Sequence, residues 1–130
     1  MAYYIDTSAL VKLVVGEAES DALRRWIGQA HPELVSSDLV RAELLRAVRR
    51  AAVDLAVQAR RVLDSITLLA VATATFESAA RLDPTMLRTL DALHLAAALE
   101  LGDDLEGLVT YDDRLAEAAQ RSGIAVMAPA

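Results

Sequence analysis

The chain has 130 residues, 55% of them hydrophobic, which is enough for one domain over residues 1–130 with a single core and too little for two domains. Polar or charged residues interrupt every apolar run before the roughly 18 to 20 residues that span a bilayer, and the lack of cysteine excludes disulfides, zinc–thiolate sites and cysteine nucleophiles. The net charge of −6 opposes a nucleic-acid substrate, unless several of the acids surround divalent cations.

The chain begins without the features of an export signal. Residues Met1 to Asp6 contain no basic residue and place an acid inside what would be the apolar part of a signal peptide. We therefore expect a cytoplasmic protein that does not act on or in a membrane.

Strand-like and helical patterns alternate along the chain. In chain order we expect a strand at Tyr3–Asp6, helices at Thr7–Val15 and Ser20–Gln29, a strand at Leu34–Ser36, helices from Ser37 to about Ala52 and from Asp54 to Asp64, a strand at Ile66–Val71, helices at Thr73–Leu82 and Asp91–Leu101, a strand at Leu108–Tyr111, a helix at Asp112–Arg121 and a strand at Ile124–Met127. Ser37 and Asp54 are expected to cap their helices. Helices long enough to cross over separate the strands, so we expect an α/β fold with a mostly parallel sheet and helices on both faces.

The apolar content exceeds what one small sheet and its helices should hide. We therefore expect the free chain to be a homodimer, extended by a further protein partner. The candidate residues for an exposed apolar stripe that a partner helix could cover are Leu23, Trp26, Ile27 and Leu45.

Two acids directly follow predicted strands. Asp6 comes after Tyr3-Tyr4-Ile5, and Asp112 comes after Leu108–Tyr111. Sites in parallel α/β sheets lie outside the carboxyl ends of the strands, so both acids are expected at one edge. The alternative for each acid is a helix cap, because the first N–H groups of the following helix need acceptors.

Two further acids lie on predicted helices. Asp91 starts a helix whose remaining faces are almost all Leu and Ala, where an unpaired carboxylate is costly unless a cation or hydrogen-bond donors meet it. Glu43 lies beside an apolar arc that includes Val40 and Leu44, and its alternative role is an exposed ion pair with Arg46.

Four carboxylates at one edge cannot all remain anions without a counter-charge, because each raises the pKa of its neighbours. Divalent cations would supply that charge, and oxygen ligands select Mg²⁺ or Mn²⁺ over Zn²⁺. Such ions orient an attacking water and stabilise the charge of an in-line phosphoryl transition state. The acids therefore predict hydrolysis of a phosphodiester.

The four acids lie in the segments Tyr4–Leu10, Ser37–Leu44, Leu90–Ala96 and Val109–Leu115. In their combination, order and spacing, these segments resemble the acid motifs of the PIN-domain nucleases and, within that family, of the VapC toxins of bacterial toxin–antitoxin pairs. The resemblance covers essentially the whole chain.

The resemblance implies a five-stranded parallel sheet, RNA cleavage that depends on Mg²⁺ or Mn²⁺, a homodimer, and a VapB-type antitoxin that wraps the domain and blocks the site. The catalytic residues that it implies, which would also hold the metal, are Asp6, Glu43, Asp91 and Asp112. The hydroxyls of Thr7 and Thr110 would hold the adjacent carboxylates. Which RNA is cut stays open.

Three arginines share one helical arc beside Glu43 and are candidates for contacts with RNA phosphates: Arg46, Arg49 and Arg50. The alternative is a solvated charged face. Lys12 is the only lysine, so other basic contacts are scarce.

Two further polar residues lie next to the acids. His94 stands one turn after Asp91 and is expected to support the site rather than to bind metal, because carboxylates suffice for hard ions. Asp113 follows Asp112 and is expected to cap a helix or to face solvent.

Two other functions remain open. A phosphatase that uses Asp6 as a nucleophile would need a second acid two residues on, where Ser8 stands. A non-catalytic interaction domain with this fold would be expected to lose some of the four acids, and none is missing.

Overall fold

A five-stranded parallel sheet forms the centre of the structure, a computed structural model that describes residues 1–130. Its strands, in the spatial order β3-β2-β1-β4-β5, are all parallel to their neighbours. The strand bounds are β1 Ala2–Ile5, β2 Glu33–Ser37, β3 Thr67–Leu69, β4 Leu105–Val109 and β5 Val126–Met127. The expected α/β fold with a parallel sheet is confirmed.

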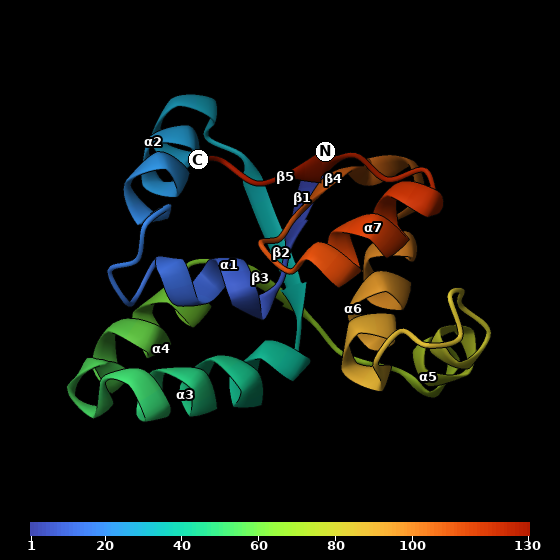
Figure 1. Ribbon diagram of the computed structural model, residues 1–130, viewed down its shortest axis with the longest axis horizontal. Helices are drawn as coiled ribbons and strands as arrows, with labels where there is room; N and C mark the ends of the chain where they lie inside the picture. Colours follow the sequence, from blue (N-terminus) through green and yellow to red (C-terminus); the bar gives the residue numbers. More distant parts are fainter.

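Seven α-helices and two 3₁₀ turns connect the strands. They are α1 Thr7–Lys12, α2 Ser20–Ala30, α3 Leu39–Ala51, η1 Val53–Leu55, α4 Ala56–Asp64, α5 Thr73–Ala80, α6 Thr89–Leu99, η2 Gly102–Asp104 and α7 Asp113–Arg121. Helices α1 to α4 lie on one side of the sheet and α5 to α7 on the other (Figure 1). None of these helices is long and apolar enough to cross a membrane.

Alternating side chains of the two central strands divide the interior into two cores. Ile5 and Val109 pack in the core under α1 to α4, whereas Tyr4 and Leu108 pack in the core under α6 and α7. Helices cover both faces of these strands at these positions, so consecutive residues are apolar there instead of alternating with polar ones. Helix α5 does not cover the sheet but packs on α6, where Ala79 meets the Ala92 side of that helix.

The order of the strands reverses between β1 and β4. The chain begins in the middle of the sheet, builds β2 and β3 on one side, and then crosses back through α5 and α6 to β4 and β5 on the other (Figure 1). In open parallel sheets, such a switch point leaves a crevice outside the carboxyl ends of the two strands. The residues that follow β1 and β4 therefore line this crevice.

Strand β4 begins three residues earlier than expected and ends at Val109 rather than at Tyr111. Gly107 reads as a turn residue in the sequence, but the strand requires it. A Cβ at this position would lie 3.0 Å from the carbonyl oxygen of Ala125 and 3.1 Å from the ring of Tyr3. Glycine thus allows two neighbouring segments to approach closely inside the sheet.

Three expectations about helix ends are wrong. Ser37 is the last residue of β2 and its buried hydroxyl has no hydrogen-bond partner, so it does not cap α3. Asp54 lies inside η1 and makes no capping hydrogen bond. Helix α1 ends at Lys12 instead of Val15, because the N–H groups of Leu13 and Val14 bond to carbonyls three residues back and tighten the chain.

The expected exposed stripe on α2 and α3 is also wrong in part. Leu23 is fully buried in the core under α1 to α4. Trp26 is half-buried and packs edge-to-face on Tyr3, with ring centroids 5.0 Å apart. Ile27 and Leu45 are half-buried against the same core. These side chains mainly hold α2 and α3 to the sheet.

Candidate functional site

The four acids named above come from four different segments near the switch point. Asp6 follows β1, and Asp112 stands three residues after the end of β4. Asp91 lies in the first turn of α6, and Glu43 lies on α3. Hydrogen bonds connect these segments to one another.

Asp6 is the most deeply buried of the four acids, with only 4% of its surface exposed. One carboxylate oxygen accepts hydrogen bonds from the Ser8 hydroxyl at 2.7 Å and from the backbone N–H of Ala9 at 3.1 Å. The other oxygen accepts from the Thr110 hydroxyl at 2.7 Å. Asp6 therefore caps α1 and also ties β1 to the segment after β4.

Burial raises the pKa of Asp6, because the charged carboxylate loses solvation. The hydrogen bonds from Thr110, Ser8 and Ala9 oppose this rise, as does the nearby imidazole of His94. Removing the negative charge of Asp6 would thus relieve the metal-free protein of an unfavourable interaction.

Asp112 both caps a helix and faces the crevice. One carboxylate oxygen accepts from the N–H groups of Arg114 and Leu115, at 2.9 and 3.2 Å, and so caps α7. The hydroxyl of Thr110 accepts the N–H of Asp112 at 3.0 Å while it donates to Asp6. Thr110 therefore links the two strand-end acids through one oxygen atom.

Arg88 joins the other carboxylate oxygen of Asp112 to Asp91. The Nε atom of Arg88 donates to Asp91 at 2.9 Å, and its Nη2 atom donates to Asp112 at 2.8 Å. The two carboxylates, Asp91 first, raise the pKa of Arg88. Asp91 is buried, as the sequence predicts, and its charge is met by this guanidinium.

Glu43 is held by two groups that the sequence places far from it. The Thr7 hydroxyl donates to its Oε1 atom at 3.0 Å, and Nε2 of His94 lies 2.6 Å from the same atom. On the other side of the ring, Nδ1 of His94 lies 2.8 Å from the hydroxyl of Tyr4, which is fully buried in β1. Glu43 does not form the exposed ion pair with Arg46 that was its alternative role.

Hydrogen bonds run from Tyr4 through His94 to Glu43. A carboxylate only accepts hydrogen bonds, so the Nε2 atom of His94 carries a hydrogen and donates it to Glu43. Burial raises the pKa of Tyr4, so its hydroxyl keeps its proton and makes a hydrogen bond with Nδ1 of His94. His94 therefore orients Glu43 and is itself oriented by the strand.

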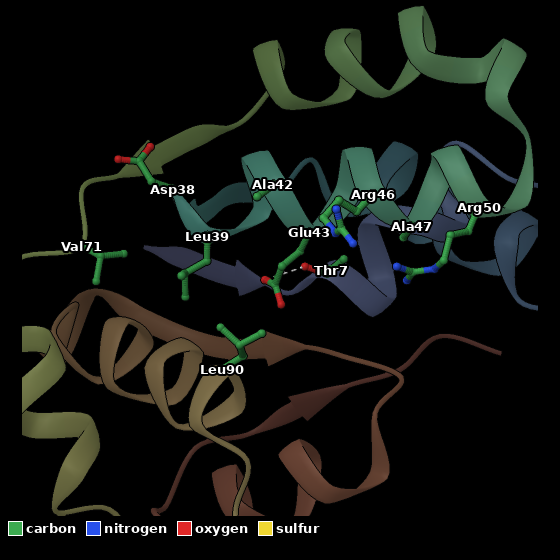
Figure 2. Close-up of a pocket in the computed structure, with 10 residues that line it drawn as sticks. All are labelled: Thr7, Asp38, Leu39, Ala42, Glu43, Arg46, Ala47, Arg50, Val71 and Leu90. Carbon is green, nitrogen blue, oxygen red and sulfur yellow. Dashed lines mark hydrogen bonds between the residues drawn. The ribbon is translucent and has the colours of Figure 1, made fainter.

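A pocket of about 660 Å³ opens beside Glu43 between α3 and the start of α6. Figure 2 shows Glu43 and Thr7 in contact at its floor, Arg46 and Arg50 along α3, and Leu90 on the opposite wall. Arg46, Arg49 and Arg50 also line a second hollow, of about 380 Å³. None of the three forms an ion pair with an acid of this chain, so all three are available to bind an anionic ligand.

No three His, Asp or Glu side chains stand close enough together to hold one metal ion as they are arranged here. Asp91 and Asp112 are separated by the guanidinium of Arg88, and Glu43 points to His94. The side chains nevertheless fit a hard divalent ion. Their donors are carboxylate oxygens, Asp6 uses three of its roughly four acceptor positions, and Mg²⁺ needs only one or two carboxylates besides water.

Three residues of this network are missing from the sequence-based candidates: Ser8, Arg88 and Tyr4. The i,i+3 spacing of Arg88 and Asp91 at a helix start is the only signal that could have indicated one of these contacts. Thr7 bonds to Glu43 rather than to its neighbour Asp6. Asp113 is exposed at the start of α7, as expected.

Residues 3–121 of the sequence match the family described as PIN domain. Three Mycobacterium tuberculosis ribonucleases are similar to nearly the whole chain. VapC46 is 50% identical over 128 residues, covering 98% of each chain. VapC35 is 40% identical over 129 residues and VapC47 is 37% identical over 131, each covering 97% of this chain and 96% of the relative.

Two solved structures have a similar fold. The M. tuberculosis toxin VapC20, described as cleaving the sarcin–ricin loop, superposes with a TM-score of 0.80 over 98% of this chain and all of its own, at 20% identity. A chain of a toxin–antitoxin complex from Klebsiella pneumoniae gives a TM-score of 0.76 over 99% of this chain and 98% of its own, at 19% identity.

Proposed function

This chain belongs to the PIN-domain family and, within it, to the VapC-type ribonuclease toxins, and on that premise we propose that it hydrolyses RNA with Mg²⁺ or Mn²⁺ held by four carboxylates. These are Asp6, Glu43, Asp91 and Asp112. One observation carries the proposal. Arg88 bonds to the carboxylates of both Asp91 and Asp112, and the Thr110 hydroxyl donates to the Asp6 carboxylate while it accepts the backbone N–H of Asp112, so three of the four acids lie in one hydrogen-bond network.

Divalent ions bound to these carboxylates would lower the pKa of a water molecule and stabilise the charge on the transferring phosphoryl group. The chain itself fixes the carboxylates. Ser8 and Thr110 hold Asp6, and the cap on α7 holds one oxygen of Asp112 while Arg88 bonds to the other. Hydrogen bonds from Thr7 and His94 fix Glu43 at the floor of the pocket.

Arg46 and Arg50 are the residues that we propose to bind the RNA backbone inside the pocket, with Arg49 beside them. Arg46 and Arg50 compensate locally for the net charge of −6, because they form no ion pair and line the same pocket as Glu43. The apolar wall of the pocket, which includes Leu39, Val71 and Leu90, offers a surface for a base rather than for a phosphate.

We further propose that the chain acts in the cytoplasm as a homodimer and that a VapB-type antitoxin covers its site. The toxin–antitoxin complex from K. pneumoniae, with the same fold, supports the pairing with an antitoxin. Large apolar side chains that remain exposed support further contacts: Val53, Val57, Phe76, Met86 and Leu90.

The two alternative functions have less support. A phosphatase that uses Asp6 as a nucleophile would need a second acid two residues on, and the residue there, Ser8, donates a hydrogen bond to Asp6 instead. A non-catalytic interaction domain would have no need for the buried Tyr4–His94 pair that orients Glu43.

The toxin function can be tested by inducing expression of the chain in a bacterial host. Wild type is expected to stop growth and to leave specific cuts in host RNA, whereas Glu43→Gln, which keeps the size and the hydrogen bond to Thr7, should do neither. Asp38→Asn is a matched control, because Asp38 lines the same pocket and pairs only with Arg41. Growth arrest by the Glu43→Gln variant at equal expression would contradict the proposal.

A further inference from the structure

Arg88 is the only arginine or lysine that contacts the acids of the site, and the sequence alone suggests no role for it. It is the residue before α6, and its backbone carbonyl accepts the N–H of Ala92 at 2.9 Å, so its main chain is fixed by the helix. Its side chain, in contrast, is 60% exposed. The guanidinium makes hydrogen bonds only to Asp91 and Asp112.

Arg88 occupies one carboxylate oxygen of each of two proposed metal ligands, Asp91 and Asp112. One oxygen of Asp112 is committed to the N–H groups at the start of α7, so the crevice is left with the other, and Arg88 takes it. Asp91 is only 12% exposed at its side chain, and Arg88 holds its Oδ2 atom. A divalent ion at these two oxygens would lie against the positive guanidinium, so each cation disfavours the binding of the other.

We propose that Arg88 is a built-in counter-cation of the metal-free site, which competes with the divalent ion for Asp91 and Asp112 and thereby sets the affinity for that ion. This inference rests on the proposed function, because it assumes that the site binds such an ion. In the absence of an ion, Arg88 neutralises two carboxylates that would otherwise repel each other, and it ties the start of α6 to the start of α7. When an ion binds, the exposed side chain swings away from the carboxylates into solvent.

The competition has a direct signature in metal binding. Titration of chelator-treated protein with Mn²⁺, followed by calorimetry or by electron paramagnetic resonance, measures affinity without any cleavage assay. We expect Arg88→Gln to bind Mn²⁺ about tenfold more tightly than wild type, since an opposite charge within contact distance changes the charging of a carboxyl by one or more powers of ten. Arg88→Lys keeps the charge but cannot span two carboxylates with one planar fork, so its affinity should fall between the two.

Stability gives a second readout that changes in the opposite direction. Without metal, Arg88→Gln should melt at a lower temperature than wild type, because Asp91 and Asp112 lose their counter-charge. Saturating Mn²⁺ should then raise the melting temperature of this variant by more than it raises that of wild type. Arg121→Gln is the matched control, because it removes the same charge from an exposed pair with Glu117 on α7, and its Mn²⁺ affinity should stay within twofold of wild type.

The outcomes separate this inference from the proposed function. If wild type binds Mn²⁺ and Arg88→Gln binds it equally or more weakly, Arg88 does not compete with the ion and the inference is overturned, while the metal site stands. If neither protein binds Mn²⁺, the metal-dependent function fails, and the inference fails with it. A gain in affinity that Arg121→Gln matches would also overturn the inference, since the effect would then be one of net charge alone.

Discussion

At the scale of a single residue, the carboxylate of Asp6 both caps α1 and lies buried between β1 and β4. Its raised pKa means that the folded chain binds this proton more tightly than the unfolded chain does. Folding therefore becomes less favourable as the pH rises from the ordinary value of 3.8 through the higher value in the folded state.

The substitution Asp6→Asn tests this cost. Asparagine can keep the hydrogen bonds to Ser8 and Ala9, and its amide can donate to Thr110, so we expect an intact fold and a metal-free protein at least as stable as wild type at pH 7. Its advantage in the free energy of unfolding should vanish below about pH 4 and grow as the pH rises. RNA cleavage should fall by more than about 100-fold.

Chemical denaturation at several pH values, combined with a cleavage assay, measures both effects of Asp6→Asn. Thr110→Val is the comparison, because it removes a donor to Asp6 and not the charge itself, and it should be less stable than wild type. A large loss of stability in Asp6→Asn at pH 7 would indicate that the residue is mainly a helix cap.

The contact of His94 with the carboxylate of Glu43 predicts a hydrogen on Nε2 of the ring. Nitrogen NMR of the metal-free protein should show this hydrogen. Tyr4→Phe removes the hydrogen-bond partner of Nδ1 and should lower the stability by about 1 kcal/mol and cleavage by roughly tenfold. Tyr111→Phe loses a comparable hydrogen bond, to the carbonyl of Pro129, and should leave cleavage near the wild-type rate. Equal losses of cleavage in both variants would show that the contact with His94 has no special role.

The residue types at the site could be predicted from the sequence, but their partners could not. Acids after strands and at a buried helix start follow from the physics of parallel sheets and of burial. The contact of Ser8 with Asp6 depends instead on side-chain rotamers, and the contact of Thr7 with Glu43 crosses 36 residues and depends on how α1 packs against α3. The contact of Arg88 with Asp112 crosses 24 residues and depends on how α6 packs against α7.

At the scale of elements, α7 shows that capping and site chemistry are not exclusive alternatives. Asp112 accepts the first N–H groups of α7 with one oxygen and faces Arg88 with the other. The sequence offers these as rival explanations of the same acid. Because the carboxylate of Asp112 has two oxygens, it can cap α7 with one and take part in the site with the other.

Two substitutions of Asp112 separate the roles. Asparagine is a good N-cap, so Asp112→Asn should keep the stability of wild type and lose cleavage. Asp112→Ala should lose both, with a cost in stability of about 1 kcal/mol. Thermal melts of both variants measure the cap, and their cleavage rates measure the site. An Asp112→Asn protein that cleaves RNA at the wild-type rate would limit this residue to capping.

Element types were largely predictable because apolar periodicity distinguishes buried strands from amphipathic helices. The residues at which the elements begin and end were less predictable. Ser37 resembles a helix cap but closes β2, and Gly107 resembles a turn but lies within β4, because neighbouring strands decide which backbone groups are paired. Such pairing is a tertiary property that a local pattern does not contain.

At the scale of the whole molecule, the parallel sheet brings together the four segments that carry the acids, although these lie as far apart in the chain as Asp6 and Asp112. The alternation of strands and helices predicts a parallel sheet. The spatial order of the strands, with β1 and β4 adjacent, follows from neither charge nor periodicity.

The oligomeric state is a prediction of the same scale. Val53 is 72% exposed and Val57 is 60% exposed on neighbouring turns of η1 and α4, and Met86 is 88% exposed on the other side of the molecule. We expect light scattering at micromolar concentration to give twice the 14.0 kDa of one chain. A stable mass of one chain over that range would contradict the homodimer.

The rate of RNA cleavage against Mn²⁺ concentration tests the central claim most directly. With a fluorescently labelled RNA and chelator-treated protein, we predict no cleavage in excess EDTA, a rate that rises to saturation with Mn²⁺ or Mg²⁺ for wild type, and background at every concentration for Asp91→Asn. Cleavage that persists undiminished in excess chelator, or that Asp91→Asn catalyses at the wild-type rate, would contradict a reaction that depends on metal held by these carboxylates.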